Sequence, residues 1–327
     1  MGRKSLFFLC LAGVSVYLLY KLSAWGFDWS LFLSTLWNVQ PLWLTASIAA
    51  TLLTYVTRAF RWQVLLDPLK SIRVGVLIST SVLGFSAIYL LGRPGEFVRP
   101  LWLARQERIP LTASVATIIV ERFLDMFMLI TLFGLALLLV KLPSAAESTL
   151  KLMKDTAWVM LAGAALAMVF LFFLRSNIER IVRYIRFARI VSLLRNFSEG
   201  LSFLDRGRSF GLAILHSVFV WIVIVLQFWT MLLGMNFHFS LAAATLVMVG
   251  AAIGSIAQVP GIGGGFQAGY VFCMMTFFFV PKEQAIATSL IAWVSSYVPT
   301  VLAGGLYMVS HGLSLKDLRT ATAEQNS

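Results

Sequence analysis

The chain has 327 residues, of which 59% are hydrophobic and 12% are charged, and its mean hydropathy is +0.87. An ordinary soluble domain has about 25% charged residues, so this composition excludes that class and indicates a single integral membrane domain over residues 1–327. The formal net charge of +12 lies in short blocks beside apolar segments, where the positive-inside rule and anionic inner-leaflet lipids explain it without nucleic acid as a partner.

The first apolar segment, Leu6–Leu22, is long enough to cross a hydrocarbon core of about 30 Å. Because it exceeds the apolar part of a signal peptide and precedes a poor cleavage site, we expect it to be retained as the first span. Residues 25–40 carry several tryptophans and are expected at the membrane interface. Pro41–Val56 is the second predicted span, and Trp62 beyond it is interpreted as an interfacial anchor. The basic residues that then mark the cytoplasmic side are Arg58, Arg61, Lys70 and Arg73.

The topology of the next apolar segment, Val74–Leu91, depends on the chain that follows it. Thr112–Val140 and Thr156–Leu174 are predicted to cross the membrane, and residues 175–208 are strongly basic and therefore expected in the cytoplasm. A complete crossing by Val74–Leu91 would place that basic block outside. We therefore predict a re-entrant or broken-helix hairpin over residues 74–110, which membranes tolerate only where it is buried in protein or lines a wet cavity.

Within the basic block, apolar residues recur at spacings near three and four from Ile178 to Asp205. This pattern predicts an amphipathic helix. The positive charge favours a helix lying on the anionic inner leaflet, and a solvated connector is the alternative.

The second half of the chain contains another interrupted apolar region. Phe210–Gly234 is the next predicted span, and residues 241–280 form a second candidate hairpin, interrupted at residues 258–267 by glycine and proline that end helices. Ala285–Val309 is the last span, so both termini are expected to be cytoplasmic. The predicted fold class is an all-α polytopic membrane protein with about six full transmembrane helices and two hairpins. The comparable positions of the hairpins suggest an inverted repeat.

Charged residues are concentrated between Gly92 and Asp125, between two apolar segments. Each ionisable group in a bilayer costs a few kcal/mol unless it is paired or hydrated, so this stretch predicts a functional site. Arginine donates two parallel hydrogen bonds to phosphate, which makes Arg93 and Arg99 the first candidates for phosphate contact. The whole candidate binding set is Arg58, Arg61, Arg93, Glu96, Arg99, Glu121, Arg122, Asp125, Gln258, Gly263, Gly264 and Gln267.

The carboxylates in this set have three candidate roles. They could position the arginines, bind an amino-bearing headgroup or take up a coupling proton. The third role arises because Glu121 and Asp125 share one helix face, where their like charges favour protonation of one carboxyl group. The opposite interpretation is a structural ion network, in which Arg122 neutralises Glu121 or Asp125 and Arg93 pairs with Glu96 to fix the hairpin.

No metal or other cofactor is predicted. Cys10 and Cys273 lie in separate apolar runs, so they indicate neither a disulfide framework nor a thiolate cluster. The three histidines, at positions 216, 238 and 311, have no ligand spacing.

Four motifs in order resemble the lysylphosphatidylglycerol synthase/flippase transmembrane family. They are residues 58–66 (RAFRWQVLL), 93–99 (RPGEFVR), 121–125 (ERFLD) and the glycine-rich loop 260–265. The resemblance covers most of the chain and implies movement of lipids between leaflets, including aminoacylated phosphatidylglycerol and polyprenyl-linked sugars. The chain departs from the family in Gln267, where the loop commonly ends in an acidic residue, and in Ser86, the nearest match to a small polar residue before the Pro-Gly-Glu turn. The soluble aminoacyl-transferase domain of the larger relatives is not expected.

The first hypothesis is therefore a flippase or scramblase of the bacterial inner membrane that passes a phospholipid or lipid-linked headgroup through a charged cavity. The alternative is a membrane-embedded transferase acting on a lipid-linked sugar or phosphate. Catalytic motifs for a transferase are not found in the sequence, although Glu121 and Asp125 could in principle hold Mg²⁺. Lipid is the expected partner, and the sequence leaves homo-oligomerisation open.

Overall fold

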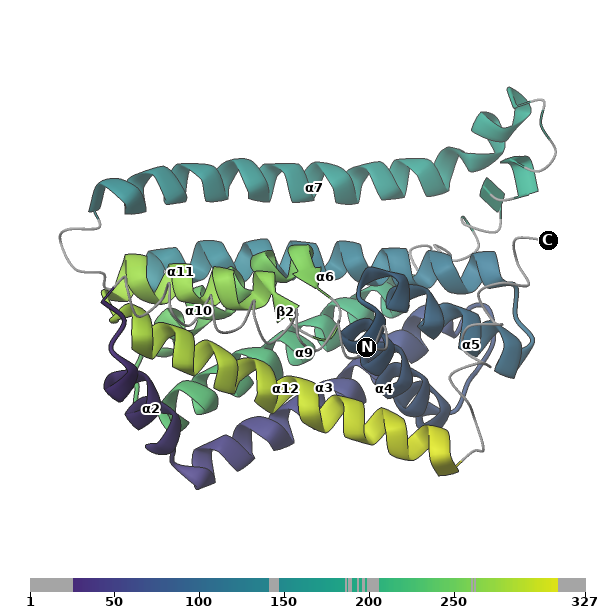
Figure 1. The fold of residues 1–327 in the computed structure, drawn as a ribbon. Helices are drawn as coiled ribbons and strands as arrows, with labels where there is room; N and C mark the ends of the chain where they lie inside the picture. The colour runs from purple at the N-terminus through teal and green to yellow at the C-terminus, as the bar shows by residue number, and fades with distance from the viewer. Residues whose placement is uncertain are drawn as a thin grey trace, which may run out of the picture.

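A computed structural model describes residues 26–140, 147–185 and 206–310, apart from residues 260 and 262, together with scattered positions between 187 and 198. The predicted first span, Leu6–Leu22, and the tail after residue 310 lie outside these residues. The described chain is a bundle of α-helices with one very short two-stranded pairing (Figure 1). The predicted class, an all-α polytopic membrane protein, is confirmed.

Four of the described helices are individually long and apolar enough to cross a membrane. They are α4 (Val74–Leu91), α6 (Leu111–Leu139), α9 (Gly207–Gly234) and α12 (Lys282–Ser310). A fifth candidate is the pair formed by α2 (Trp29–Trp37) and α3 (Pro41–Leu66), which meet at 74°. The Asp28 carboxylate starts α2 by accepting a 3.0 Å hydrogen bond from the Leu31 N–H, which satisfies a free donor of the first turn.

Helix α3 is longer than predicted. It continues past Val56 to Leu66 and so carries Arg58, Arg61 and Trp62 within a regular helix. Arg61 and Trp62 are fully buried, so Arg61 does not mark the cytoplasmic side as an exposed charge, as was predicted for the basic residues of this segment. Positive charge marks the cytoplasmic side only where it stays in water, and here carboxylates from another helix compensate it inside the protein.

The longest helix, α7 (Glu147–Arg183), lies along α6 on the outside of the bundle (Figure 1). The amphipathic helix predicted from Ile178 to Asp205 begins inside α7, which ends at Arg183 and is followed by a turn at Tyr184. A single helix over that range is therefore wrong. Residues 175–183 contain neither glycine nor proline, so nothing local ends the helix after Leu174. Residues 199–205 lie outside the described part.

The predicted first hairpin is formed by α4, the short 3₁₀ helix η1 (Arg93–Phe97) and α5 (Val98–Glu107). Gly92 ends α4 with φ +72°, a conformation that glycine adopts without strain. The returning chain lies directly on α4, because a Cβ at Gly95 would overlap the Ala87 carbonyl group and a Cβ at Gly84 would approach Arg99 Cβ to 2.7 Å. These contacts make α4 and α5 the two arms of a compact helical hairpin.

The second hairpin consists of α10 (Leu241–Gly254), η4 (Ser255–Ala257) and α11 (Gly265–Phe278). At its tip β1 (Gln258–Val259) pairs antiparallel with β2 (Gly263–Gly264). Each long arm has 14 residues, about 21 Å of helix, which is too short to cross the hydrocarbon core.

The arms of the second hairpin touch through glycines. Gly250 and Gly254 of α10 face Gly265 and Gly269 of α11 so closely that a Cβ at any of these four positions would overlap atoms of the opposite arm. Each arm thus carries one Gly-x-x-x-Gly pair, the spacing with which membrane helices approach closely. Sequence reasoning treated only residues 258–267 as informative and missed this signal.

Substituting Gly254 with alanine is expected to destabilise the protein by about 1–3 kcal/mol, because the added methyl group meets the Gly265 backbone, which cannot move as a flexible side chain can. Thermal unfolding in detergent measures the effect. Gly305→Ala in α12 is the matched control, because nothing lies within 4 Å of a Cβ there. Equal melting temperatures for the two variants would contradict the assigned packing.

The tips of the two hairpins meet inside the bundle. The Gly261 N–H at the second tip donates a 2.9 Å hydrogen bond to the Tyr89 carbonyl oxygen near the end of α4. In Figure 1, α10 and α11 lie toward the left of the view and α4 and α5 toward the right, so the hairpins approach from opposite ends of the bundle. This is the arrangement that the inverted-repeat hypothesis requires.

Candidate functional site

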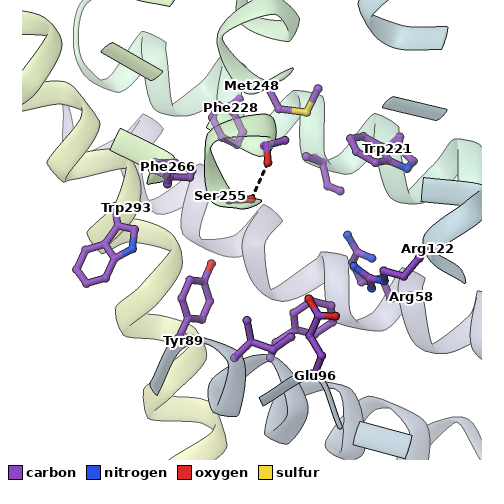
Figure 2. Close-up of a pocket in the computed structure, with 14 residues that line it drawn as sticks. Arg58, Tyr89, Glu96, Arg122, Trp221, Phe228, Met248, Ser255, Phe266 and Trp293 are labelled. Carbon is purple, nitrogen blue, oxygen red and sulfur yellow. Dashed lines mark hydrogen bonds between the residues drawn. The ribbon is translucent and has the colours of Figure 1, made fainter. Parts of the chain in front are cut away.

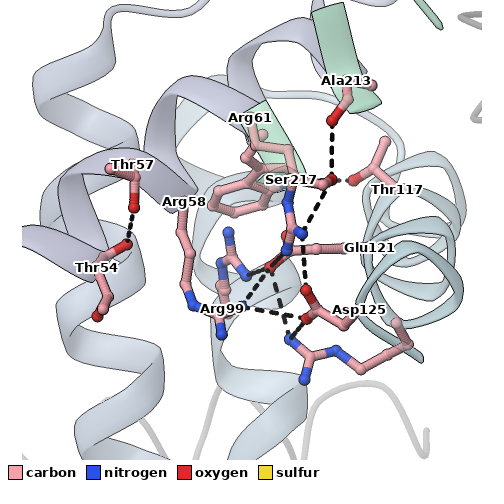
Figure 3. Close-up of polar contacts among 12 residues, drawn as sticks. Thr54, Thr57, Arg58, Arg61, Arg99, Thr117, Glu121, Asp125, Ala213 and Ser217 are labelled. Atoms are coloured by element: carbon pink, nitrogen blue, oxygen red, sulfur yellow. Dashed lines mark hydrogen bonds and ion pairs between the residues drawn. The ribbon is translucent and has the colours of Figure 1, made fainter. Parts of the chain in front are cut away.

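Four arginines contact two carboxylates where α3, α5, α6 and α9 meet, and Figure 3 shows most of them. We call this group the arginine–carboxylate cluster; its members are Arg58 and Arg61 from α3, Arg99 from α5, and Glu121, Arg122 and Asp125 from α6. Helix periodicity explains how single elements supply several members, since residues three and four apart lie on one face.

Arg61 is the centre of the cluster. Its Nη1 lies 2.7 Å from Asp125 Oδ1 and its Nη2 lies 3.0 Å from Glu121 Oε1. Ser217 of α9 accepts a further hydrogen bond of 3.3 Å from Arg61 Nη1. One guanidinium therefore bridges both carboxylates and ties α3 to α6 and α9.

Arg99 is held by a carboxylate and by an aromatic ring. Its Nη1 donates a 2.8 Å hydrogen bond to Glu121 Oε1, and its guanidinium lies over the Trp62 ring, 3.9 Å from the ring centre. Trp62 is fully buried and its indole N–H donates to Thr117 Oγ1 at 3.0 Å. The prediction that Trp62 anchors at the membrane interface was wrong, because its polar nitrogen finds a partner inside the protein and its ring face attracts a cation.

The cluster has a sealed inner part and an accessible outer part. The side chains of Arg61 and Glu121 are 0% exposed and that of Arg99 is 5% exposed. Arg58 and Arg122 contact the same carboxylates at 3.2 to 3.6 Å, but their side chains are 12% and 43% exposed. In this structure the first three residues are closed off from solvent, whereas the last two are accessible to a ligand.

Positive charge exceeds negative charge within the cluster. Its four arginines face two carboxylates, and Arg99 Nε and Nη2 are buried without a hydrogen-bond acceptor among the described residues. The proton expected on Glu121 or Asp125 is not needed to relieve their repulsion, because guanidinium groups lie between them. The two arginines in excess, Arg58 and Arg122, are the accessible members of the cluster, and an anion that contacts them can neutralise their charge.

A cavity of about 280 Å³ lies beside the outer part of the cluster (Figure 2). Its walls come from both hairpins and from α3, α6, α9 and α12. The lining side chains are Arg58, Phe85, Ile88, Tyr89, Glu96, Arg122, Trp221, Ile224, Phe228, Met248, Ala252, Ser255, Phe266 and Trp293. The cavity thus joins a charged end, at Arg58, Glu96 and Arg122, to an aromatic end, at Tyr89, Phe266 and Trp293.

Comparison with known proteins identifies the family. The family model described as the transmembrane region of lysylphosphatidylglycerol synthase matches residues 8–304. The chain belongs to this family. It is also 24% identical over 283 residues to the UPF0104 membrane protein MJ1595 of Methanocaldococcus jannaschii, an alignment covering 76% of this chain and 82% of the relative. No solved structure matches the chain significantly.

The motifs that suggested the lysylphosphatidylglycerol synthase transmembrane family converge on the cluster and the cavity. Of the predicted binding residues, Arg58, Glu96 and Arg122 line the cavity, while Arg61, Arg99 and Glu121 lie behind it. Asp125 is 9% exposed and links Arg58 to Arg61. The structure therefore separates these predicted arginines into two that line the cavity, Arg58 and Arg122, and two that are buried behind it, Arg61 and Arg99.

The glycine-rich motif shapes the second hairpin tip. Gly263 has φ +88°, and a Cβ there would lie 2.7 Å from both Gln267 Oε1 and Trp293 Nε1. Gly264 has φ +75° in β2, so both glycines are required by the backbone conformation. Gln267 packs against this turn and does not line the cavity. Gln258 pairs with Gly264 in the strand register, but its side chain and that of Arg93 lie outside the described part.

Ser86, the candidate for the family's small polar residue, faces another helix. Its hydroxyl donates 2.7 Å hydrogen bonds toward the carbonyl oxygens of Val82 and Thr300, where it joins α4 to α12. Sequence reasoning did not predict the aromatic end of the cavity, whose residues come from α4, α11 and α12 and share no local motif. Among the described residues, no group of three or more histidine, cysteine, aspartate or glutamate side chains could hold a metal ion.

Proposed function

We propose that the protein translocates phosphate-bearing lipids between the leaflets of its membrane, with the headgroup passing through the cavity between the hairpin tips. The excess of positive charge beside this cavity is the observation that carries the proposal. Arg58 and Arg122 line the cavity while also touching the buried carboxylates. They present a positive surface that is oriented in advance and that a phosphate can neutralise.

The physical requirement of lipid translocation supports this function. A headgroup leaving water must exchange its hydration for protein polar groups, while the acyl chains stay in an apolar environment. The cavity supplies polar groups at Glu96 and Arg122 and has far more room than the roughly 10–15 Å³ that one water needs. Binding and release of a headgroup require no covalent step, and we propose transport without catalysis.

The positions of the two hairpins determine how deep in the membrane the proposed path lies. We propose that α4–α5 re-enters from the cytoplasmic side and α10–α11 from the opposite side, with both termini cytoplasmic and the protein in a bacterial inner membrane. The 14-residue arms of the second hairpin are too short to cross, and the Gly261–Tyr89 hydrogen bond joins the tips. Irregular backbone at that depth fits a position that lines a hydrated cavity.

Reconstitution into vesicles tests the proposal. Vesicles are prepared with phosphatidylglycerol that carries a fluorophore on one acyl chain, and dithionite is added to reduce the label exposed outside. We expect the protein to extend reduction to lipids that began in the inner leaflet, which protein-free vesicles retain. The same fluorescent fraction in both preparations, with folded protein verified in the vesicles, would refute lipid translocation.

A further inference from the structure

We infer that the basic segment after the predicted span Thr156–Leu174 docks on the anionic surface of the inner leaflet as a folded-back lobe. We call residues 175–198 the arginine lobe; it contains six arginines and one acidic residue, Glu179. The described residues of the lobe do not line the cavity, so this inference goes beyond the proposed translocation.

An aromatic contact shows where the lobe begins relative to the apolar layer. The Phe172 ring of α7 packs edge-on against the Phe210 ring of α9, with 5.4 Å between the ring centres. Arg175 follows Phe172 by three residues and Arg208 precedes Phe210 by two. Both helices therefore change from apolar residues to arginine at the same level. Arginine at the end of an apolar segment keeps its stem in the apolar layer and its charge among the headgroups.

Two polar contacts fold the lobe back along the end of α7. Arg175 Nη1 donates hydrogen bonds of 2.9 and 2.7 Å to the carbonyl and hydroxyl oxygens of Ser198. Arg195 Nη2 lies 3.1 Å from Glu179 Oε2. Because the earlier residue of α7 pairs with the later residue of the lobe, the second segment returns antiparallel to α7. The chain thus leaves the level of Arg175 and comes back to it at Ser198.

The end of α7 has a buried side and an exposed side. Ile178 and Val182 are 7% and 6% exposed, and helix periodicity puts them on the side where Glu179 meets the returning segment. Arg180 lies on the other side and is exposed, and Tyr184, four residues later, is 88% exposed. The lobe therefore covers its own apolar residues and still presents an arginine and an aromatic ring outward.

The exposed side chains of the lobe fit a layer of anionic headgroups. Phe187 and Ile190, at the bend, are 71% and 44% exposed. Aromatic rings favour the membrane interface, and guanidinium groups pair with the phosphates of anionic lipids. Figure 1 shows this end of α7 turning away from the other helices, so lipid borders it in the plane of the membrane. An acidic soluble protein would match the charge, but the position at the edge of the apolar layer favours the membrane surface.

Photocrosslinking from the lobe tests this docking. Benzoylphenylalanine replaces Phe187 in the full chain, and Phe173 is the control position, because it is 58% exposed on α7 inside the predicted span. The proteins are irradiated in nanodiscs of phosphatidylcholine, alone or mixed with phosphatidylglycerol, and mass spectrometry quantifies the lipid adducts. Each sample is measured at low salt and at about 1 M salt, where the Debye length falls to about 3 Å.

We expect position 187 to capture lipid in the anionic discs at low salt and to lose this capture in neutral discs or at high salt. Position 173 should capture lipid in every condition. Arg180→Gln and Arg183→Gln should each lower capture at position 187 about fivefold, the ratio that corresponds to about 1 kcal/mol per arginine at an anionic surface. Both arginines are exposed, so we expect these variants to fold, and unchanged capture at position 173 verifies it.

Two results would overturn the docking. Equal capture at position 187 in neutral and anionic discs would show that the arginines do not direct it. Absence of lipid adducts at position 187, with normal capture at position 173, would show that the lobe does not reach the membrane, and capture of an acidic soluble protein in intact cells would then identify its partner class. None of these results depends on whether the protein translocates lipid.

Discussion

Glu121→Gln is expected to lower the free energy of unfolding by about 3–5 kcal/mol, the cost of removing one partner from a buried ion pair. Glu121 Oε1 lies 2.8 Å from Arg99 Nη1 and 3.0 Å from Arg61 Nη2, and its side chain is 0% exposed. The neutral amide would leave Asp125 as the last carboxylate of the cluster, in contact with three guanidinium groups, and would remove the carboxylate partner of Arg99. Water cannot replace the lost ion pairs with Glu121, because Arg61 and Arg99 are buried.

Unfolding in detergent, followed by circular dichroism, measures this effect. Glu179→Gln is the matched control, since Glu179 makes a comparable 3.1 Å ion pair with Arg195 but its side chain is 63% exposed. Exposed pairs contribute little, so we expect that variant to stay within about 0.5 kcal/mol of the parent. Adding Arg99→Met to Glu121→Gln should restore part of the stability by removing one uncompensated charge. A parent-like unfolding curve for Glu121→Gln alone would mean that the carboxylate does not hold the cluster together.

Arg122→Gln is expected to slow lipid translocation by about 10- to 100-fold, the effect of losing a charge-assisted hydrogen bond worth about 1.5–3 kcal/mol. Arg122 lines the cavity, and its contacts with Glu121 and Asp125 are long, at 3.5 and 3.6 Å. Because its side chain is 43% exposed, we expect folding to be nearly unaffected. Arg58→Gln should also slow translocation, with a larger loss of stability because Arg58 is 12% exposed and lies 3.2 Å from Asp125.

The dithionite assay measures the rate of translocation. An arginine-to-glutamine substitution away from the cavity serves as the control, because it removes the same charge without changing the cavity. Arg208→Gln removes an exposed arginine of α9 that does not line the cavity, and parent-like rates are expected. Arg99→Gln should reduce folded yield, because Arg99 is bound to Glu121 and stacked on Trp62. Parent-like translocation by folded Arg122→Gln would exclude Arg122 as a headgroup contact.

The sequence by itself determined the membrane class, most helix positions and the location of the two breaks. Long apolar segments leave little choice in a bilayer, because only a helix satisfies its own backbone hydrogen bonds there. Glycine and proline at residues 92–95 and 258–265 then predicted where those helices stop. The charged residues that form the cluster were also identified, because an ionisable side chain between apolar segments is conspicuous in any sequence.

Only the tertiary structure decided what each charged residue does. Arg99 and Arg122 look equivalent in the sequence, yet Arg99 is sealed against Trp62 while Arg122 lines the cavity. Likewise, Trp293 becomes part of the site only because the second hairpin brings Gly263 against it. Burial, ion pairing and cavity shape depend on distances between segments far apart in the chain, and local composition carries no information about those distances.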